Sequence, residues 1–216
     1  MHPIASDTLH VSGYGAQNSF TTTCSRAIVD VLPKRTNVTV AIYKVIAATM
    51  TNNPPVNVPT QSDLKSYLDG LYGTQANVFF NVMTSTTVVV NYDLDGDTNL
   101  DDRAAIYSSE VQAVLSNAFT SGAVNVYYVN SLKTGFTGDT PANAANIHVS
   151  FIADVHTNST VNITAHEIGH AMGLRHPPTN QLTAVDRLMW WLGQPSNPCR
   201  LIRDEWTNVN KNAISP

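Results

Sequence analysis

The sequence predicts an α+β fold with a twisted mixed sheet of five strands, two long helices packed on it, and a small irregular C-terminal subdomain. Three observations support this prediction. Runs rich in β-branched and aromatic residues alternate with loops rich in Gly, Pro and Asn. Other segments carry apolar residues at the spacing of one helix face. After Pro177 and Pro178, the sequence shows no regular pattern before a short turn near residues 203–206.

The expected strands follow from β-branched and aromatic composition. They cover residues 38–46, 78–82, 86–90, 124–129 and 147–152. The second and third runs lie so close in the chain that they form either a hairpin or one long bent strand. The stretch between Gly135 and Ile152 is expected to supply an edge strand of the sheet.

Three helical segments are expected. The first begins at a cap formed by Thr60 or Ser62 and ends near residue 72. The second is expected to begin at Asp101 or Asp102 and to end at Gly122. The third covers residues 161–173, and its core-facing stripe consists of Val161, Ala165, Ile168 and Met172.

Length and composition restrict the class of protein. The 216 residues suffice for one domain, which we expect to cover residues 1–216. Residues 1–176 would form its upper subdomain and residues 177–216 its lower one. The net charge of −4 argues against nucleic acid as a partner. No apolar run approaches the roughly 20 residues that cross a bilayer.

Location and assembly are less constrained by the sequence. Charged residues make up only 13%, and Asn, Thr and Ser replace them, which favours a secreted, extracellular protein. The first residues are not an intact signal peptide, so they fit either a mature chain with an added Met or a cytosolic protein. A monomer is expected.

The two cysteines, Cys24 and Cys199, are too few for a disulfide scaffold. Three interpretations remain open. They form one disulfide between the two ends of the chain, or they are buried thiols. Alternatively, Cys24 is an inhibitory metal ligand in a propeptide formed by residues 1–35, with Lys34 and Arg35 at the processing site.

The third helix carries the residues of a metal centre. His166 and His170 are four residues apart, so both imidazoles can reach one metal ion. Gly173 can adopt a left-handed conformation that turns the chain sharply and brings His176 to the same ion. Glu167 lies within reach of a water on the metal. Three neutral nitrogen ligands and one open position are typical of catalytic zinc.

This segment matches every fixed position of H-E-x-x-H-x-x-G-x-x-H, so the chain resembles the metzincin zinc metalloproteases. Its motif is most similar to those of matrixins and serralysins, and Pro177 follows the third histidine as in serralysins. The resemblance implies that Met189 is the methionine of the turn beneath the zinc, although an ordinary core methionine fits the same place. The chain departs from astacins and serralysins at Trp191, where those families have a tyrosine, and it lacks the calcium repeats of serralysins.

The resemblance implies a zinc-dependent endopeptidase with protein or peptide substrates. Zinc lowers the pKa of a bound water to about 7, and Glu167 takes its proton and passes it to the leaving amine. The edge strand between Gly135 and Ile152 would pair with the substrate. Two alternatives remain open, a catalytically silent binding module and a zinc hydrolase of small amides. A purely structural zinc is excluded because such sites use four protein ligands.

A second candidate metal site precedes the second helix. Oxygen side chains at alternate positions can converge on Ca²⁺. The candidate ligands are Asp93, Asp95, Asp97, Asn99 and Asp101. The run departs from an EF-hand loop at Thr98 and Ala104. The alternative is an acidic turn without a metal, in which Asp101 or Asp102 caps the following helix.

Overall fold

The computed structural model describes residues 35–102, 107–141, 148–154, 160–176, 187–189 and 201. Most of the predicted lower subdomain lies outside the described residues. The same holds for Cys24, Cys199 and Trp191, and for nearly all of the predicted propeptide. Within the described residues, no helix has the length and apolar character needed to span a bilayer.

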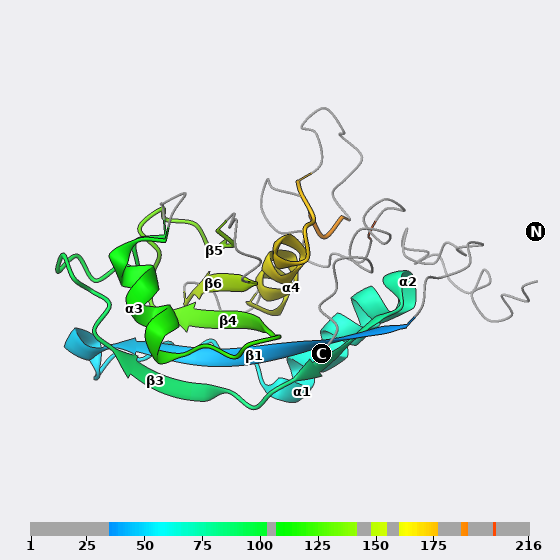
Figure 1. The fold of residues 1–216 in the computed structure, drawn as a ribbon, viewed down its shortest axis with the longest axis horizontal. Helices are drawn as coiled ribbons and strands as arrows, with labels where there is room; N and C mark the ends of the chain where they lie inside the picture. The colour runs from blue at the N-terminus through cyan, green and yellow to red at the C-terminus, as the bar shows by residue number, and fades with distance from the viewer. Residues whose placement is uncertain are drawn as a thin grey trace, which may run out of the picture.

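A mixed sheet of six strands forms the centre of the fold (Figure 1). The strands are β1 (Thr36–Ala47), β2 (Val78–Val82), β3 (Thr86–Val90), β4 (Val124–Val129), β5 (Gly138–Asp139) and β6 (Val149–Ala153). Their order is β2-β1-β4-β6-β5, with β3 also paired to β1. Among these pairs, β5 with β6 is antiparallel and the others are parallel. The predicted α+β class with a mixed sheet is confirmed.

Strands β2 and β3 share one position in the sheet. β2 pairs with the first half of β1, from Thr36 to Val40, and β3 pairs with the second half, from Tyr43 to Ala47. The sheet is therefore five positions wide, and the two runs form one interrupted, bent edge rather than a hairpin. The length of β1, 12 residues, makes this arrangement possible.

The first predicted helix is confirmed. α1 (Gln61–Leu68) continues through a π-helical turn, η3 (Asp69–Gly73), into α2 (Thr74–Ala76). Between β1 and α1 lies a short 3₁₀ turn, η2 (Ala48–Met50). Thr60 caps α1, since its hydroxyl oxygen accepts a hydrogen bond from the backbone N–H of Asp63 at 3.1 Å. The helical run ends at Asn77, which has a left-handed backbone conformation.

The second helix begins later than predicted. α3 (Ser109–Asn117) has Ser108 as its cap, and the Ser108 hydroxyl accepts a hydrogen bond from the N–H of Val111 at 3.1 Å. The prediction that Asp101 or Asp102 begins this helix is wrong. Asp102 instead accepts hydrogen bonds from the backbone N–H and the hydroxyl of Thr134, at 3.1 and 2.5 Å. A distant loop thus takes the carboxylate that local sequence assigned to a cap.

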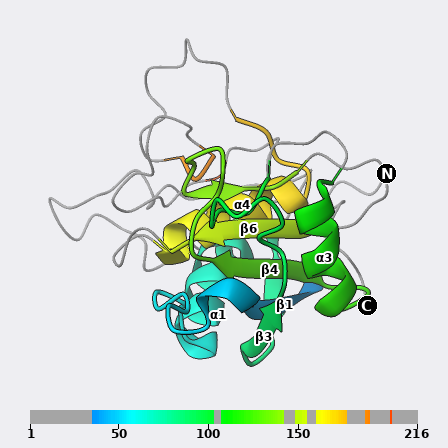
Figure 2. The same cartoon turned by 90° about the vertical axis from the view of Figure 1, so that its left-hand side faces the viewer.

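Alternate side chains of the sheet enter two different cores. Val38, Val40 and Ile42 of β1 face the core formed with α1 and α4 (Thr160–Ala171). Ala41, Tyr43 and Val45 face the core formed with α3. The sheet therefore lies between helices on both faces, as Figure 2 shows for α1 and α3. β4 and β6 are buried along their whole length, which is expected of parallel strands covered on both faces.

Replacing Ile42 by Ala tests this assignment of faces. The side chain is 1% exposed in the core formed with α1 and α4, so we expect the free energy of unfolding to fall by about 2–5 kcal/mol. Val89→Ala on edge strand β3 is the control, because Val89 is 56% exposed and its truncation should change stability by about 0.5 kcal/mol or less. Urea denaturation measures both values, and equal losses would contradict the assignment.

Candidate active site

Helix α4 is fixed in place by its apolar face. Of the predicted stripe, Ala165, Ile168 and Met172 are fully buried against the sheet and α1, and Val161 is partly buried. The hydroxyl of Tyr72 donates a hydrogen bond to the carbonyl of Ala165 at 2.7 Å, which adds a directional contact to the packing. The orientation of this face determines where the polar residues of α4 point.

The turn after α4 is a Schellman motif. Gly173 has a φ of 87°, as the sequence predicted. Its N–H donates to the carbonyl of His170 at 2.8 Å, and the N–H of Leu174 donates to the carbonyl of Gly169 at 2.9 Å. These two bonds reverse the chain within a few residues, so that His176 returns to α4.

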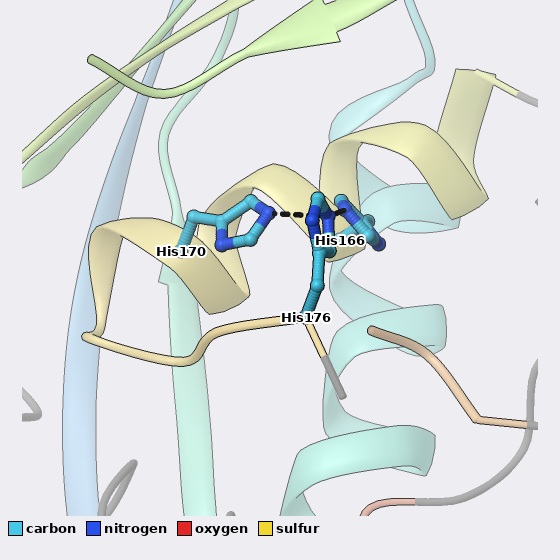
Figure 3. Close-up of side chains that lie close together, drawn as sticks. All are labelled: His166, His170 and His176. Atoms are coloured by element: carbon cyan, nitrogen blue, oxygen red, sulfur yellow. Dashed lines mark hydrogen bonds between the residues drawn. The ribbon is translucent and has the colours of Figure 1, made fainter. Parts of the chain in front are cut away.

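The three predicted histidines meet at one point (Figure 3). His166 and His170 extend from α4, and His176 reaches them from the chain that follows the turn. The Nε2 atom of His176 lies 3.1 Å from Nε2 of His166 and 3.1 Å from Nε2 of His170. Side chains ten residues apart in the sequence therefore present the same ring atom to the same place.

Backbone carbonyls determine which ring nitrogen faces the centre. The Nδ1 atom of His166 donates to the carbonyl of Leu188 at 2.7 Å, and that of His170 donates to the carbonyl of Leu174 at 2.8 Å. A carbonyl only accepts, so Nδ1 carries the hydrogen and Nε2 keeps its lone pair. Burial lowers the pKa of His166 to about 3 and that of His170 to about 4, which keeps both rings neutral.

The donor set fits a zinc ion. Lone pairs that face one another at 3.1 Å repel unless a cation or a proton lies between them. A tetrahedral ion with Zn–N distances of about 2.0–2.1 Å places its ligands about 3.4 Å apart, so small ring movements suffice. Three neutral imidazoles would hold the ion and leave a fourth position for water or substrate.

Met189 packs beneath this part of α4. It is fully buried, and Gly169 makes its approach possible. A Cβ atom on Gly169 would lie 2.7 Å from the Sδ atom of Met189 and 2.9 Å from the hydroxyl oxygen of Tyr72. The neighbouring residue, Leu188, supplies the carbonyl that orients His166. The segment 187–189 therefore supports the histidines both by packing and by a hydrogen bond.

The Glu167 carboxylate lies against the edge strand. Its side chain is 6% exposed, and Oε2 accepts a hydrogen bond from the hydroxyl of Thr140 at 2.7 Å. A Cβ on Gly138 would lie 2.8 Å from Oε1. Burial raises the pKa of Glu167 to about 8, which the Thr140 hydrogen bond opposes and the charge of Asp139 favours. A dication at the histidines would lower this pKa, because an opposite charge favours the carboxylate.

Sequence reasoning did not identify Gly138, Thr140 or the carbonyls of Leu174 and Leu188. Thr140 lies in the stretch from which the edge strand is predicted, but nothing in the pattern of that stretch signals a contact with Glu167. The backbone carbonyls carry no side-chain signal at all. These groups are found only when the strand and the helix are placed side by side.

The acidic loop brings together a different set of residues from the one predicted. Carboxylate oxygens of Asp93, Asp95 and Glu110 lie within 4.8 Å of one another, and Glu110 was not among the predicted ligands. The side-chain amide of Asn99 donates to the carbonyl of Asp97 at 2.9 Å. The backbone N–H of Asp101 donates to Glu110 at 2.8 Å.

Contacts within the protein already compensate the charges of this loop. The Lys133 ammonium pairs with Asp95 and, at 3.0 Å, with Asp97. A hydrogen bond from the backbone of Asn99 and the contact with Lys133 lower the pKa of Asp97. The buried Glu110 accepts the backbone N–H of Leu94 at 2.9 Å in addition to that of Asp101. These contacts favour the metal-free acidic turn. The structure does not test calcium binding itself, so the calcium site stays a prediction from the sequence.

Comparisons with known proteins give distant structural similarities. No known family profile matches the sequence, and no curated protein matches it. Metalloproteinase-II from Bacteroides fragilis is similar over 86% of this chain, with 13% identity and a TM-score of 0.48, and the chain spans 55% of its length. Archaemetzincin from Archaeoglobus fulgidus is similar over 79% of this chain and 99% of its own, with 14% identity and a TM-score of 0.46.

A zinc-dependent peptidase from Methanocorpusculum labreanum is similar over 80% of this chain and all of its own, with 9% identity and a TM-score of 0.49. Similarities of this strength assign neither an activity nor a substrate to this chain. The functional argument therefore rests on the side chains and their geometry.

Gly173→Ala tests the turn that positions His176. A side chain at a φ of 87° costs roughly 1–2 kcal/mol, so we expect a lower free energy of unfolding and weaker metal binding. Gly70→Ala is the control, since a Cβ there meets nothing within 4 Å. Denaturation and metal titration measure both effects. Unchanged metal affinity in Gly173→Ala would contradict the idea that this turn positions His176 for the metal.

Calcium addition tests the acidic loop. We expect no change in the Tm of the parent protein, because Lys133 already pairs with Asp95 and Asp97. Lys133→Met leaves these carboxylates without their cation, so its Tm should rise when calcium is added. Calorimetry measures both. A calcium-dependent rise in the parent that Asp95→Ala abolishes would instead support the predicted calcium site.

Proposed function

We propose that this chain is a zinc-dependent endopeptidase of the metzincin type. His166, His170 and His176 would hold the zinc, and Glu167 would be the general base. The observation that carries the proposal is the convergence of three neutral Nε2 atoms, two of them oriented by backbone carbonyls. A glutamate that follows the first ligand directly supplies the carboxylate that hydrolysis requires.

The proposed mechanism divides the work between the metal and the side chains. When bound, zinc activates a water molecule and polarises the scissile carbonyl. Glu167 accepts the proton of the attacking water and delivers it to the leaving amine. The three histidines would serve as neutral ligands, because burial lowers the pKa of each ring.

The edge strand gives a reason to propose a peptide substrate rather than a small amide. β5 is the last strand in the order of the described sheet and runs antiparallel to β6. An extended peptide that adds to a sheet edge makes main-chain hydrogen bonds along it. A peptide added at β5 passes Gly138, beside which the carboxylate of Glu167 lies.

The metzincin class is supported by three features together. The signature from His166 to His176 is complete, Gly173 makes the left-handed turn within it, and Met189 packs beneath α4. A secreted location remains our proposal from the composition, in which Asn, Thr and Ser replace charged residues.

Replacing Glu167 separates catalysis from metal binding. We expect Glu167→Ala to lower the rate on a peptide substrate by at least about 10²–10⁴-fold, the range for loss of a general base. Its zinc content should remain that of the parent, one ion per chain, since Glu167 is not a ligand. Peptide cleavage followed by mass spectrometry, together with elemental analysis, measures both quantities.

Histidine variants provide the matched comparison. His170→Ala should lose both zinc and activity. His148→Ala should keep both, because His148 donates its Nδ1 hydrogen to the carbonyl of Ala171 at the end of α4 and is not among the three converging rings. If Glu167→Ala kept more than about a tenth of the parent rate, the mechanism would be abandoned. A parent that binds zinc but cuts no peptide would instead support the binding module or the small-amide hydrolase.

A further inference from the structure

The carboxylate of Glu167 is held by a small hydrogen-bond network that joins three elements. The hydroxyl oxygen of Thr140, directly after β5, lies 2.7 Å from Oε2 of Glu167 and 3.0 Å from its backbone oxygen. It also lies 2.9 Å from the hydroxyl oxygen of Ser150 in β6. Ser150 is fully buried, and its hydroxyl lies 3.2 Å from the carbonyl of Glu167.

The number of hydrogens determines how this network is arranged. Thr140 has one hydroxyl hydrogen, and its shortest contact is with the carboxylate, which accepts the stronger bond when ionised. The hydrogen of Ser150 then goes to the oxygen of Thr140 or to the carbonyl of Glu167. In both arrangements the Thr140 hydroxyl donates its hydrogen bond to Oε2, so both are consistent with one position of the carboxylate.

Gly138 lies against the other side of the Glu167 carboxylate. A Cβ on Gly138 would lie 2.8 Å from both Cγ and Oε1 of Glu167. Residues two apart on a strand face the same side, so Gly138 and Thr140 both face α4. The missing side chain at Gly138 leaves space for the glutamate, and the hydroxyl of Thr140 anchors it there.

We propose that Thr140 is a positioning residue for Glu167, fixing the carboxylate beside the edge strand through the hydrogen bond to Oε2 and with the support of Ser150. This inference rests on the proposed function, in which Glu167 is the general base. The hydrogen bond from Thr140 would couple the base to the edge strand that would bind the substrate. A base held in one position avoids the loss of rate that a misplacement of about 1 Å can cause.

Three threonine variants test the proposal on the zinc-loaded protein. Thr140→Val keeps the shape and removes the hydroxyl, so kcat should fall about 10- to 100-fold, as expected for the loss of a hydrogen bond to a charged group. KM and zinc content should stay near the parent values. Thr140→Ser restores the hydroxyl and should recover most of kcat.

Thr134→Val is the matched control. It removes the same kind of bond, from a threonine hydroxyl to a carboxylate on the same segment of chain, but its acceptor is Asp102 and not Glu167. Its kcat should equal that of the parent. A Thr140→Val variant with the parent kcat, or one that loses no more rate than Thr134→Val, overturns the proposal.

A second measurement needs neither zinc nor activity. The chain has three glutamates, Glu110, Glu167 and Glu205, so ¹³C labelling of the glutamate carboxyl carbon gives three NMR signals. Glu167→Gln assigns the signal of interest. In the metal-free protein at fixed pH, this signal should move in Thr140→Val and stay in place in Thr140→Ser and Thr134→Val. An unmoved signal in Thr140→Val overturns the proposal.

The two measurements separate the possible failures. If the parent cuts no peptide, the proposed function fails, and the NMR comparison still decides whether Thr140 holds the carboxylate. If Thr140→Val does not fold, Thr140→Ala takes its place with the same expectations.

Discussion

The meeting of three imidazole Nε2 atoms at one point is the constraint on which the rest of the site depends. Rings that present lone pairs to a shared point repel one another, so each ring has to be held in place by other contacts. For His166 and His170, helix α4 and the carbonyls of Leu188 and Leu174 provide this support. For His176, the left-handed Gly173 directs the chain back toward the helix. Packing of α4 against the sheet keeps these histidines and carbonyls in place relative to one another.

The position of Glu167 depends on a different part of the molecule. Its neighbours in α4 orient its backbone, but its carboxylate lies against Gly138 and Thr140 at the edge of the sheet. The antiparallel pairing of β5 with β6 brings this edge to the helix. Glu167 therefore lies where helix α4, which is buried along its apolar face, meets the edge strand β5. In the proposed function, this contact would link the binding of an extended substrate to the general base.

In the acidic loop, contacts within the protein balance the charges of the carboxylates. Lys133 pairs with Asp95 and Asp97, and Glu110 accepts two backbone N–H groups. Each carboxylate named here has a donor within the protein. A pattern of alternating acidic residues is thus compatible with a turn stabilised by its own chain, because a lysine distant in sequence supplies the opposite charge.

The sequence by itself determined the metal-binding motif, the left-handed turn at Gly173, the apolar stripe of α4 and the alternation of strands and helices. These features depend on residues close in the chain, whose spacing follows from helix and strand geometry. The tertiary structure alone decided that β2 and β3 share one edge, that α3 begins at Ser109, and that Asp102 bonds to Thr134. It also decided that Thr140 meets Glu167 and that Lys133 meets the acidic loop. These contacts join residues far apart in the chain, and no local pattern encodes which distant partner a polar side chain will find.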